Sequence, residues 1–193
     1  MKKLLITGFD PFGGEEINPS WEAVKLLPSN INGYALTKLN IPVVFGDALS
    51  ALLSEADKVH PDVILSIGQA GGRGEITPEY VAINLRYAKI PDNNGFEPKD
   101  EAVIEGGDCA YFSTIPTRKI ADTLAAASIP SKVSYSAGTY VCNDLLYGLL
   151  AHFKNTDTKV GFIHIPYCTE QNKEPSMDIN EIVRGLILAI ESL

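Results

Sequence analysis

Three side chains in this sequence have the chemistry of a nucleophile, a base and an orienting acid. The first is Cys142, at the start of an apolar helical pattern in SYSAGTYVCNDLLYGLL, residues 134–150, where an apolar strand is expected to give way to a helix. The first amides of a helix lack internal acceptors and the helix dipole is positive there, so a thiol at this end is favoured as thiolate. The alternative is a small buried cysteine that fills a gap in the core.

His164 interrupts the apolar segment VGFIHIPY close to the end of an expected strand. An imidazole there, with Cys142 at a neighbouring strand end, would make a nucleophile and base pair. A buried structural histidine is the alternative. His60 precedes a proline in a connection and is expected to be exposed, and His152 lies roughly 15 Å beyond Cys142 by helical rise.

A carboxylate is needed to orient such an imidazole, and Glu79 is the candidate. Glu79, Val81 and Ile83 occupy alternate positions of one expected strand, so their side chains point to the same face. The carboxyl group of Glu79 would then lie among apolar groups and would require a partner or a raised pKa. An orienting acid and a salt bridge at a strand end are the two roles open to it. Asp92, in IPDNNG, is a competing carboxylate whose alternative role is an Asx turn.

The elements that must position these side chains alternate between strand and helix patterns. Strands are predicted at residues 3–7, 34–44, 63–67, 133–135 and 159–165, and helices after Asn18-Pro19 and at 48–59, 116–127, 143–153 and 177–193. Residues 78–87 alternate and are expected to form an antiparallel excursion with 110–114. Repeated βα units predict an α/β fold, a three-layer α/β/α sandwich with a mostly parallel twisted sheet. Ligands of such folds lie at strand carboxyl ends.

Composition favours one globular domain over residues 1–193, with 45% hydrophobic and 21% charged residues. A net charge of -8 without a basic run argues against nucleic acid or an anionic membrane as partner. No apolar run approaches a membrane span, and Phe9-Asp10-Pro11 interrupts the first one too early for a signal peptide, so a cytoplasmic protein is expected. Cys109, Cys142 and Cys168 lack the number and spacing of a disulfide framework or a metal site, so reduced thiols are expected.

Five ordered segments carry a family resemblance over almost the whole chain: GFDPFGG at 8–14, GQAGGRGEITPEYVAIN at 68–84, IPDNNG at 90–95, SYSAGTYVCND at 134–144 and FIHIPY at 162–167. Together they resemble the pyroglutamyl peptidase I family, also called pyrrolidone carboxyl peptidase. The resemblance implies a cysteine exopeptidase that removes N-terminal pyroglutamyl residues from peptides, without a cofactor and commonly as a homotetramer. By position it makes Cys142 the nucleophile, His164 the base and Glu79 the third member of a triad.

The same resemblance suggests how the substrate is held. Pyroglutamate is a small neutral lactam, so its pocket should be apolar with a few hydrogen-bonding groups. By resemblance Phe9 and Phe12 would face the lactam ring, although both also fit a local loop core. Asn18 and Gln69 are candidates for its polar edge. The motif GFDPFGG matches neither GxGxxG nor a P-loop, which argues against a phosphate site.

An oxyanion would be held by the Cys142 amide at the helix start, and in the family a basic residue just before IPDN assists. Lys89 stands there instead of the usual Arg, which keeps the charge but loses the planar fork. Tyr80 and Thr169 also depart from the family pattern, which has a basic residue and a proline at these positions. Two other classes stay open: a hydrolase or phosphorylase that would need a phosphate or nucleoside site, and a silent binding protein without a reactive thiol.

Overall fold

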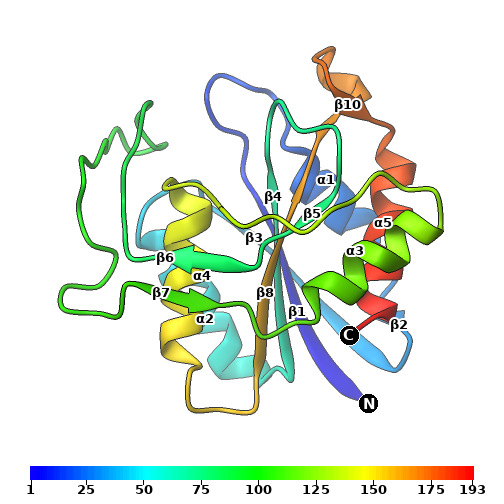
Figure 1. Cartoon of the computed structure of the whole chain (residues 1–193), viewed down its shortest axis with the longest axis horizontal. Coiled ribbons are helices and arrows are strands. Elements are labelled where there is room, and N and C mark those ends of the chain that lie inside the picture. Colours follow the sequence, from blue (N-terminus) through cyan, green and yellow to red (C-terminus); the bar gives the residue numbers. More distant parts are fainter.

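A six-stranded sheet with helices on both faces organises the chain, and the computed structural model describes all residues from 1 to 193 (Figure 1). The strand order is β2-β3-β1-β4-β8-β5. The bounds are β1 Lys2–Phe9, β2 Asn30–Ile31, β3 Tyr34–Ile41, β4 Val63–Gln69, β5 Thr77–Pro78 and β8 Lys159–Ile165. Strands β3, β1, β4 and β8 are parallel, and the short edge strands β2 and β5 are antiparallel. The predicted mostly parallel α/β sheet is therefore confirmed.

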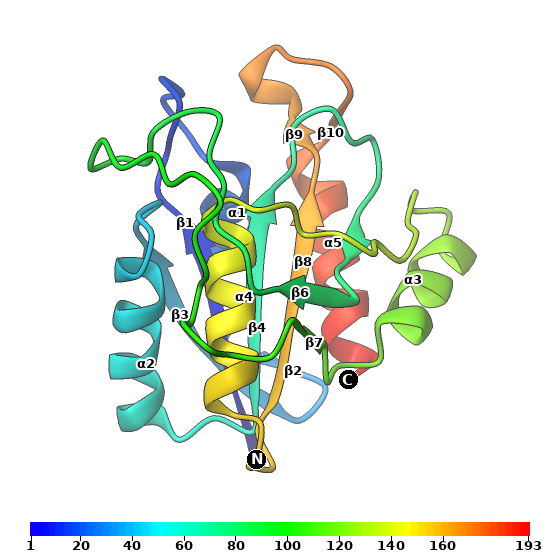
Figure 2. The ribbon, with the colours of Figure 1, turned by 60° about the vertical axis from the view of Figure 1, so that its left-hand side comes forward.

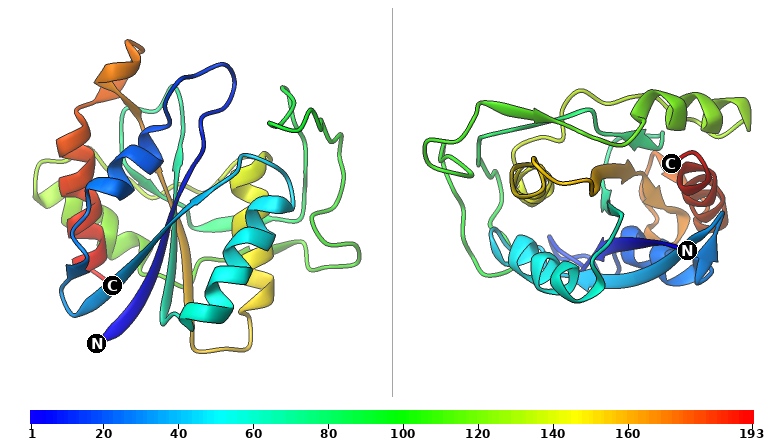
Figure 3. Two further views of the ribbon diagram at one scale, coloured as in Figure 1. Left: turned by 180° about the vertical axis from the view of Figure 1, so that it is seen from behind. Right: turned by 90° about the horizontal axis from the view of Figure 1, so that it is seen from below.

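Five α-helices cover the two faces of this sheet. They are α1 Pro19–Leu26, α2 Asp47–Val59, α3 Thr117–Ala126, α4 Val141–His152 and α5 Ile179–Glu191. Helices α1, α3 and α5 pack on one face, and α2 and α4 pack on the other (Figures 2 and 3). This is the three-layer arrangement that the sequence predicts. None of these helices has the length and apolar character needed to cross a membrane.

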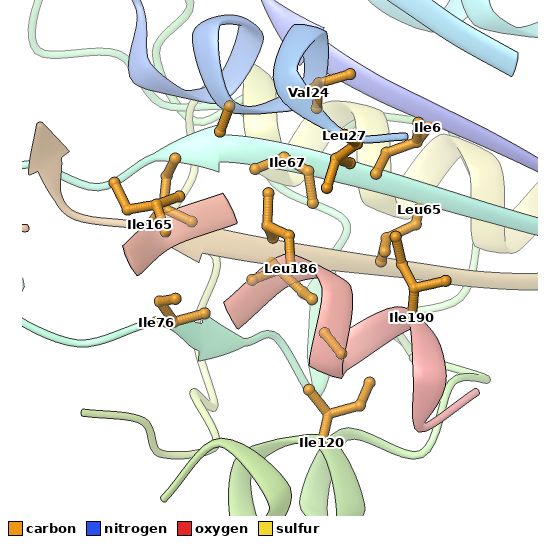
Figure 4. Packing of buried hydrophobic residues seen from close by; sticks show 14 of the residues in the cluster. Ile6, Val24, Leu27, Leu65, Ile67, Ile76, Ile120, Ile165, Leu186 and Ile190 are labelled. Carbon is orange, nitrogen blue, oxygen red and sulfur yellow. The ribbon is translucent and has the colours of Figure 1, made fainter. Parts of the chain in front are cut away.

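Alternate residues of each central strand enter different cores. Ile6 of β1, Leu65 of β4 and Ile165 of β8 pack with side chains of α1, α3 and α5, such as Leu186 (Figure 4). Their neighbours, such as Ile64 of β4, enter the second core beneath α2 and α4. Burial on both faces explains why these strands are continuous apolar runs. Because these strands are also parallel, their carboxyl ends lie at the same edge of the sheet.

Helix α1 begins as its sequence predicts. Asn18 is the N-cap, its Oδ1 accepts a hydrogen bond from the Ser20 amide at 3.1 Å, and Pro19 occupies the first helical position. Proline is suited to this position because the N–H that it lacks would have no acceptor within the helix. The helix start is therefore fixed beside the loop that follows β1.

The antiparallel excursion is present but shorter than its alternating pattern predicts. Strand β6 Val81–Ile83 pairs with β7 Ala110–Phe112, as expected for part of the segment. Pro78, the first residue of the predicted segment, instead belongs to β5, which joins the edge of the main sheet. Residues 84–109 extend past α4 as a long connection (Figure 1). Two small elements precede α5. One is a two-stranded sheet of β9 Tyr167–Cys168 and β10 Ser176–Met177, and the other is the 3₁₀ turn Thr169–Gln171.

The strand predicted at residues 133–135 is wrong, and so is the expected strand leading into Cys142. The Ser134 amide donates to Pro78 O at 2.9 Å and Ser134 O accepts from the Tyr80 amide at 2.7 Å, which is a single bridge and not a ladder. The serine side chains here bond neighbouring backbone, as Ser134 Oγ does to Ser136 O at 3.2 Å, and such bonds compete with strand pairing. An irregular loop therefore delivers the chain to α4.

Candidate active site

Most of the residues singled out from the sequence line one cavity of about 250 Å³ at the carboxyl ends of β1, β4 and β8. The lining includes Phe9, Phe12, Asn18, Gln69, Cys142 and His164, together with Arg73, Gly138 and Tyr140. This is the edge at which parallel sheets bind ligands. Glu79 lies behind this lining and Lys89 lies outside it.

Cys142 is the second residue of α4, so its predicted place in the first helical turn is confirmed. Gly138, in the left-handed region at φ +78°, lets the preceding loop turn into the helix. The thiol lies close to the backbone of Gly68, where an added Cβ would be 3.2 Å from Sγ. Gly68 is the register partner of His164 between β4 and β8. The nucleophile candidate thus lies over the strand pair that carries the base candidate.

Two buried polar residues explain how the start of α4 is held. Asn143 Oδ1 accepts from the Ile83 amide at 2.9 Å, which ties the helix to β6. Asp144 accepts from Arg86 Nε at 2.5 Å and from the Gly46 amide at 3.0 Å. Both side chains are fully buried, and their partners satisfy them. The polar pair after Cys142 therefore anchors the helix turn that presents the thiol.

The expectation that the helix start alone makes Cys142 a thiolate is wrong. Burial, followed by the negative charge of Glu79, raises the pKa of the Cys142 thiol to about 12. Arg73 and a backbone N–H act in the opposite direction but do not outweigh the burial. Desolvation penalises the charged form of an acid more strongly than one helix terminus stabilises it. The helix terminus alone therefore does not favour the charged form of this thiol.

His164 and Glu79 form a buried hydrogen-bonded pair. Nδ1 of His164 lies 2.6 Å from Oε1 of Glu79, and the two side chains are 5% and 0% exposed. The Phe162 ring packs on the imidazole with centroids 4.7 Å apart. Because Nδ1 is engaged by the carboxylate, Nε2 is the nitrogen left to act on a thiol. Burial alone would raise the pKa of Glu79. The hydrogen bond from His164, the charge of His164 and the hydrogen bond from Arg73 outweigh burial and hold this pKa below its usual value.

The partner that Glu79 requires is therefore His164, with Arg73 as a second one that the sequence analysis missed. Arg73 Nη1 donates to Glu79 Oε1 at 2.7 Å and to Thr77 Oγ1 at 2.8 Å. Its Nη2 donates to Ser136 O at 3.0 Å. The available signal was a basic side chain in the glycine-rich loop after β4, close in sequence to the buried acid.

Asp92, the competing carboxylate, takes the turn-forming role. Its Oδ1 accepts from the amides of Asn94 and Phe96, each at 2.9 Å, which is the expected Asx-type pattern. Its Oδ2 accepts from the Phe45 amide at 3.0 Å. These bonds fold part of the connection between β6 and β7, and Asp92 lies outside the cavity lining.

Aromatic side chains form the apolar wall of the cavity. Phe9 is 2% exposed and its ring lies 6.2 Å from that of Phe162, so it belongs to the core as well as to the wall. Phe12 is half-buried, and its ring lies 6.2 Å from that of Tyr140. Tyr140, the N-cap residue of α4, was not identified from the sequence. Its place two residues before the thiol is the signal that could have found it.

The polar candidates Asn18 and Gln69 differ in whether they have hydrogen-bonding groups free for a ligand. Asn18 Nδ2 donates to Asp10 O at 2.9 Å, and its Oδ1 accepts from the amide and hydroxyl of Ser20, so both ends hold the rim loop. Gln69 Oε1 accepts from Gln171 Nε2 at 2.9 Å, and no bond in the structure uses Gln69 Nε2. Gln69 therefore keeps free donors at the cavity.

Lys89 is exposed and lines an adjacent cavity of about 240 Å³ with Phe12 and Tyr140. It is not part of the cavity that holds Cys142 and His164. The Cys142 amide, in contrast, belongs to the first turn of α4 and donates to no loop carbonyl before the helix. The helix start thus supplies an unpaired donor at the thiol.

Comparison with known proteins places this geometry in a family. The family model described as pyroglutamyl peptidase matches residues 2–193. A pyrrolidone-carboxylate peptidase of Clostridium perfringens is 48% identical, with 99% of this chain and 92% of that protein aligned. One from Thermosipho africanus is also 48% identical, over 99% and 96% of the two chains. The crystal structure of Bacillus amyloliquefaciens pyroglutamyl peptidase I superposes with a TM-score of 0.95 at 44% identity, over 100% of this chain and 96% of that one. The chain belongs to the pyroglutamyl peptidase family of cysteine peptidases.

Proposed function

We propose that this enzyme hydrolyses the bond after the N-terminal pyroglutamyl residue of peptides, through Cys142, His164 and Glu79. Family membership supports the substrate class. The observation that carries the mechanism is the buried 2.6 Å pair of His164 Nδ1 and Glu79, on the strand beside the Gly68 backbone that underlies the thiol. A thiol, an imidazole and a carboxylate in this order match the logic of a catalytic triad.

The thiol enters the reaction as a neutral group, since its pKa is raised to about 12. His164 Nε2 takes the Sγ proton as the sulfur attacks the pyroglutamyl carbonyl carbon, and the tetrahedral oxyanion accepts a bond from the Cys142 amide. Glu79 stabilises the imidazolium that forms. The imidazolium then protonates the leaving amine, the C–N bond breaks, and a thioester to Cys142 remains. A water deprotonated by His164 attacks the thioester and releases pyroglutamate and the thiol.

The cavity lining provides a physical basis for the choice of a lactam. Phe9, Phe12 and Tyr140 offer apolar contact, and Gln69 Nε2 is free to donate to a carbonyl oxygen. No aspartate or glutamate lines the cavity, and its one permanent charge is the guanidinium of Arg73. An ordinary peptide would have to bury its N-terminal ammonium without a carboxylate partner, which is costly. A pyroglutamyl peptide carries no such charge and avoids that cost.

We infer further that residues 1–193 act as one catalytic domain, that it assembles as a homotetramer, and that it works in the cytoplasm. The first core draws residues from Leu4 to Ile190, and the second draws residues from Leu5 to Phe162, which supports the single domain. The resemblance to the family supports the tetramer, and three cysteines without a disulfide suit a reducing compartment. Light scattering should give a mass near four times the 20.9 kDa of one chain. A mass of one or two chains would exclude the tetramer.

Release of a chromophore from a pyroglutamyl amide by the reduced protein tests the function. We expect cleavage of this amide and not of the matching prolyl and glutamyl amides. Cys142→Ser should abolish cleavage, whereas Cys109→Ser, which changes an exposed thiol outside the cavity, should retain it. Full activity of Cys142→Ser would refute the mechanism, and cleavage of the prolyl amide at a similar rate would refute the substrate class.

A further inference from the structure

The contacts of Arg73 converge on the carboxylate that orients the base. Oε1 of Glu79 accepts two short bonds, 2.6 Å from His164 Nδ1 and 2.7 Å from Arg73 Nη1. Oε2 is buried and has no hydrogen-bond partner. The position and the charge of this carboxylate therefore depend on two neighbours that share one oxygen.

The loop that carries Arg73 is shaped to bring the guanidinium to this point. Gly72 adopts φ +85°, a backbone conformation that side chains rarely adopt. Gly71 packs against Tyr167, where an added Cβ would be 2.2 Å from the phenolic oxygen. Arg73 then spans the carboxylate, the Thr77 hydroxyl and Ser136 O with one planar fork. A lysine has a single ammonium and does not reproduce this geometry.

We propose that Arg73 is a positioning residue of the reaction, which acts through Glu79 to keep the Cys142 and His164 proton transfer favourable. This inference rests on the triad of the proposed function. With Arg73 present, the positive guanidinium balances the Glu79 charge both before and after the proton moves from sulfur to imidazole. Without it, the new thiolate faces an excess negative charge in a buried site, which Coulomb interaction disfavours.

The variants that test this proposal are Arg73→Gln, Arg73→Lys and Arg184→Gln. The first removes the charge and the fork, and the second keeps only the charge. The third removes an arginine charge from the exposed pair with Glu181 on α5, away from the cavity, and serves as the matched control. Each variant is first compared with wild type by thermal unfolding, so that activity is measured only at temperatures at which it is folded.

Two readouts separate positioning from a purely structural role. The first is kcat and KM with the pyroglutamyl amide, and we expect Arg73→Gln to lower kcat by about 10- to 100-fold with a smaller change in KM. The second is the rate of Cys142 alkylation by iodoacetamide at neutral pH, followed by mass spectrometry and divided by the rate of Cys109 in the same sample. Because the pKa of the Cys142 thiol is raised to about 12, this rate follows the small thiolate fraction. We expect the rate ratio to fall by about tenfold in Arg73→Gln and to return part of the way in Arg73→Lys. Arg184→Gln should match wild type in both.

A double-mutant cycle with Glu79→Gln tests whether Arg73 acts through the carboxylate. Once Glu79 is neutral, Arg73→Gln should cause little further loss of kcat, because the charge it balances is gone. Full additivity in kcat, or a folded Arg73→Gln with an unchanged kcat and alkylation rate ratio, would overturn the proposal. A rise in KM alone would assign Arg73 to substrate contact and would also overturn it. The alkylation assay needs no substrate, so it gives its answer even if the pyroglutamyl amide is not cleaved.

Discussion

Gly68→Ala is the substitution whose effect can be worked out most directly from the structure. An added Cβ at this position would lie 2.6 Å from Phe162 Cζ, 2.8 Å from Phe162 Cε1 and 3.2 Å from Cys142 Sγ. Ordinary carbon contacts are about 3.5–4.0 Å, so the Phe162 ring must move by about 1 Å. That ring packs on the His164 imidazole, with centroids 4.7 Å apart. One methyl group therefore displaces groups on both sides of the proposed proton transfer.

The expected cost has a stability part and a catalytic part. Inserting a methyl group into a packed core costs about 1–3 kcal/mol. For a chain of this size each kcal/mol lowers Tm by about 2–4 °C, so thermal unfolding should detect the change. A displacement of about 1 Å at a reacting group lowers kcat by about 100-fold. We expect both losses in Gly68→Ala, measured by calorimetry and by steady-state cleavage of the pyroglutamyl amide well below Tm.

Gly161→Ala is the matched control, because Gly161 lies on the same strand as His164 but on the opposite face. Its added Cβ would be 2.2 Å from Ile115 Cδ1, beneath the α1, α3 and α5 layer. This variant should lose stability and keep its kcat. A Gly68→Ala protein with the kcat of wild type would refute the argument that the bare backbone at this position is what lets the thiol and the imidazole meet.

Two other substitutions test charges at and near the site. Glu79 has a pKa below the usual 4.5 in the folded protein, so its contribution to stability is complete above that value and is lost as pH falls through the folded pKa. In urea unfolding, Glu79→Gln should therefore show a shallower loss of stability than wild type as pH falls from about 5 to 3, and an equal slope would contradict this assignment. Lys89→Ala should lower kcat by less than about threefold, because the ammonium is exposed and lines the adjacent cavity. A loss of about 100-fold is typical of removing an oxyanion donor and would assign that role to Lys89.

Local sequence patterns placed the two residues at the centre of the proposed mechanism correctly in the fold, because their places depend on where strands end and helices begin. The apolar repeat after Cys142 predicts a helix that starts beside it, and that is where α4 starts. The apolar run around His164 predicts a buried strand, which is β8. Both elements are specified by residues near in sequence, so periodicity suffices to find them.

The features that the sequence did not reveal depend on contacts between distant segments. Ser134 pairs at a single bridge, and its own hydroxyl donates to Ser136 O and accepts from Arg73. Strand propensity does not register such bonds. Arg73 reaches Glu79 only because two loops fold together. The raised pKa of Cys142 has a related cause, since the burial of its thiol beside the Gly68 backbone follows from the packing of α4 on the sheet.

The narrow edges of the sheet bear on how the protein avoids aggregation. A long parallel sheet with open edges exposes unpaired N–H and C=O groups to strands of other molecules. Here the outer strands are the two-residue β2 and β5, and β5 contains Pro78, which has no N–H to donate. Such edges offer a poor template for strand addition. The proline at this edge also immediately precedes Glu79. The short strand β5 therefore both ends the sheet and places the acid beside His164.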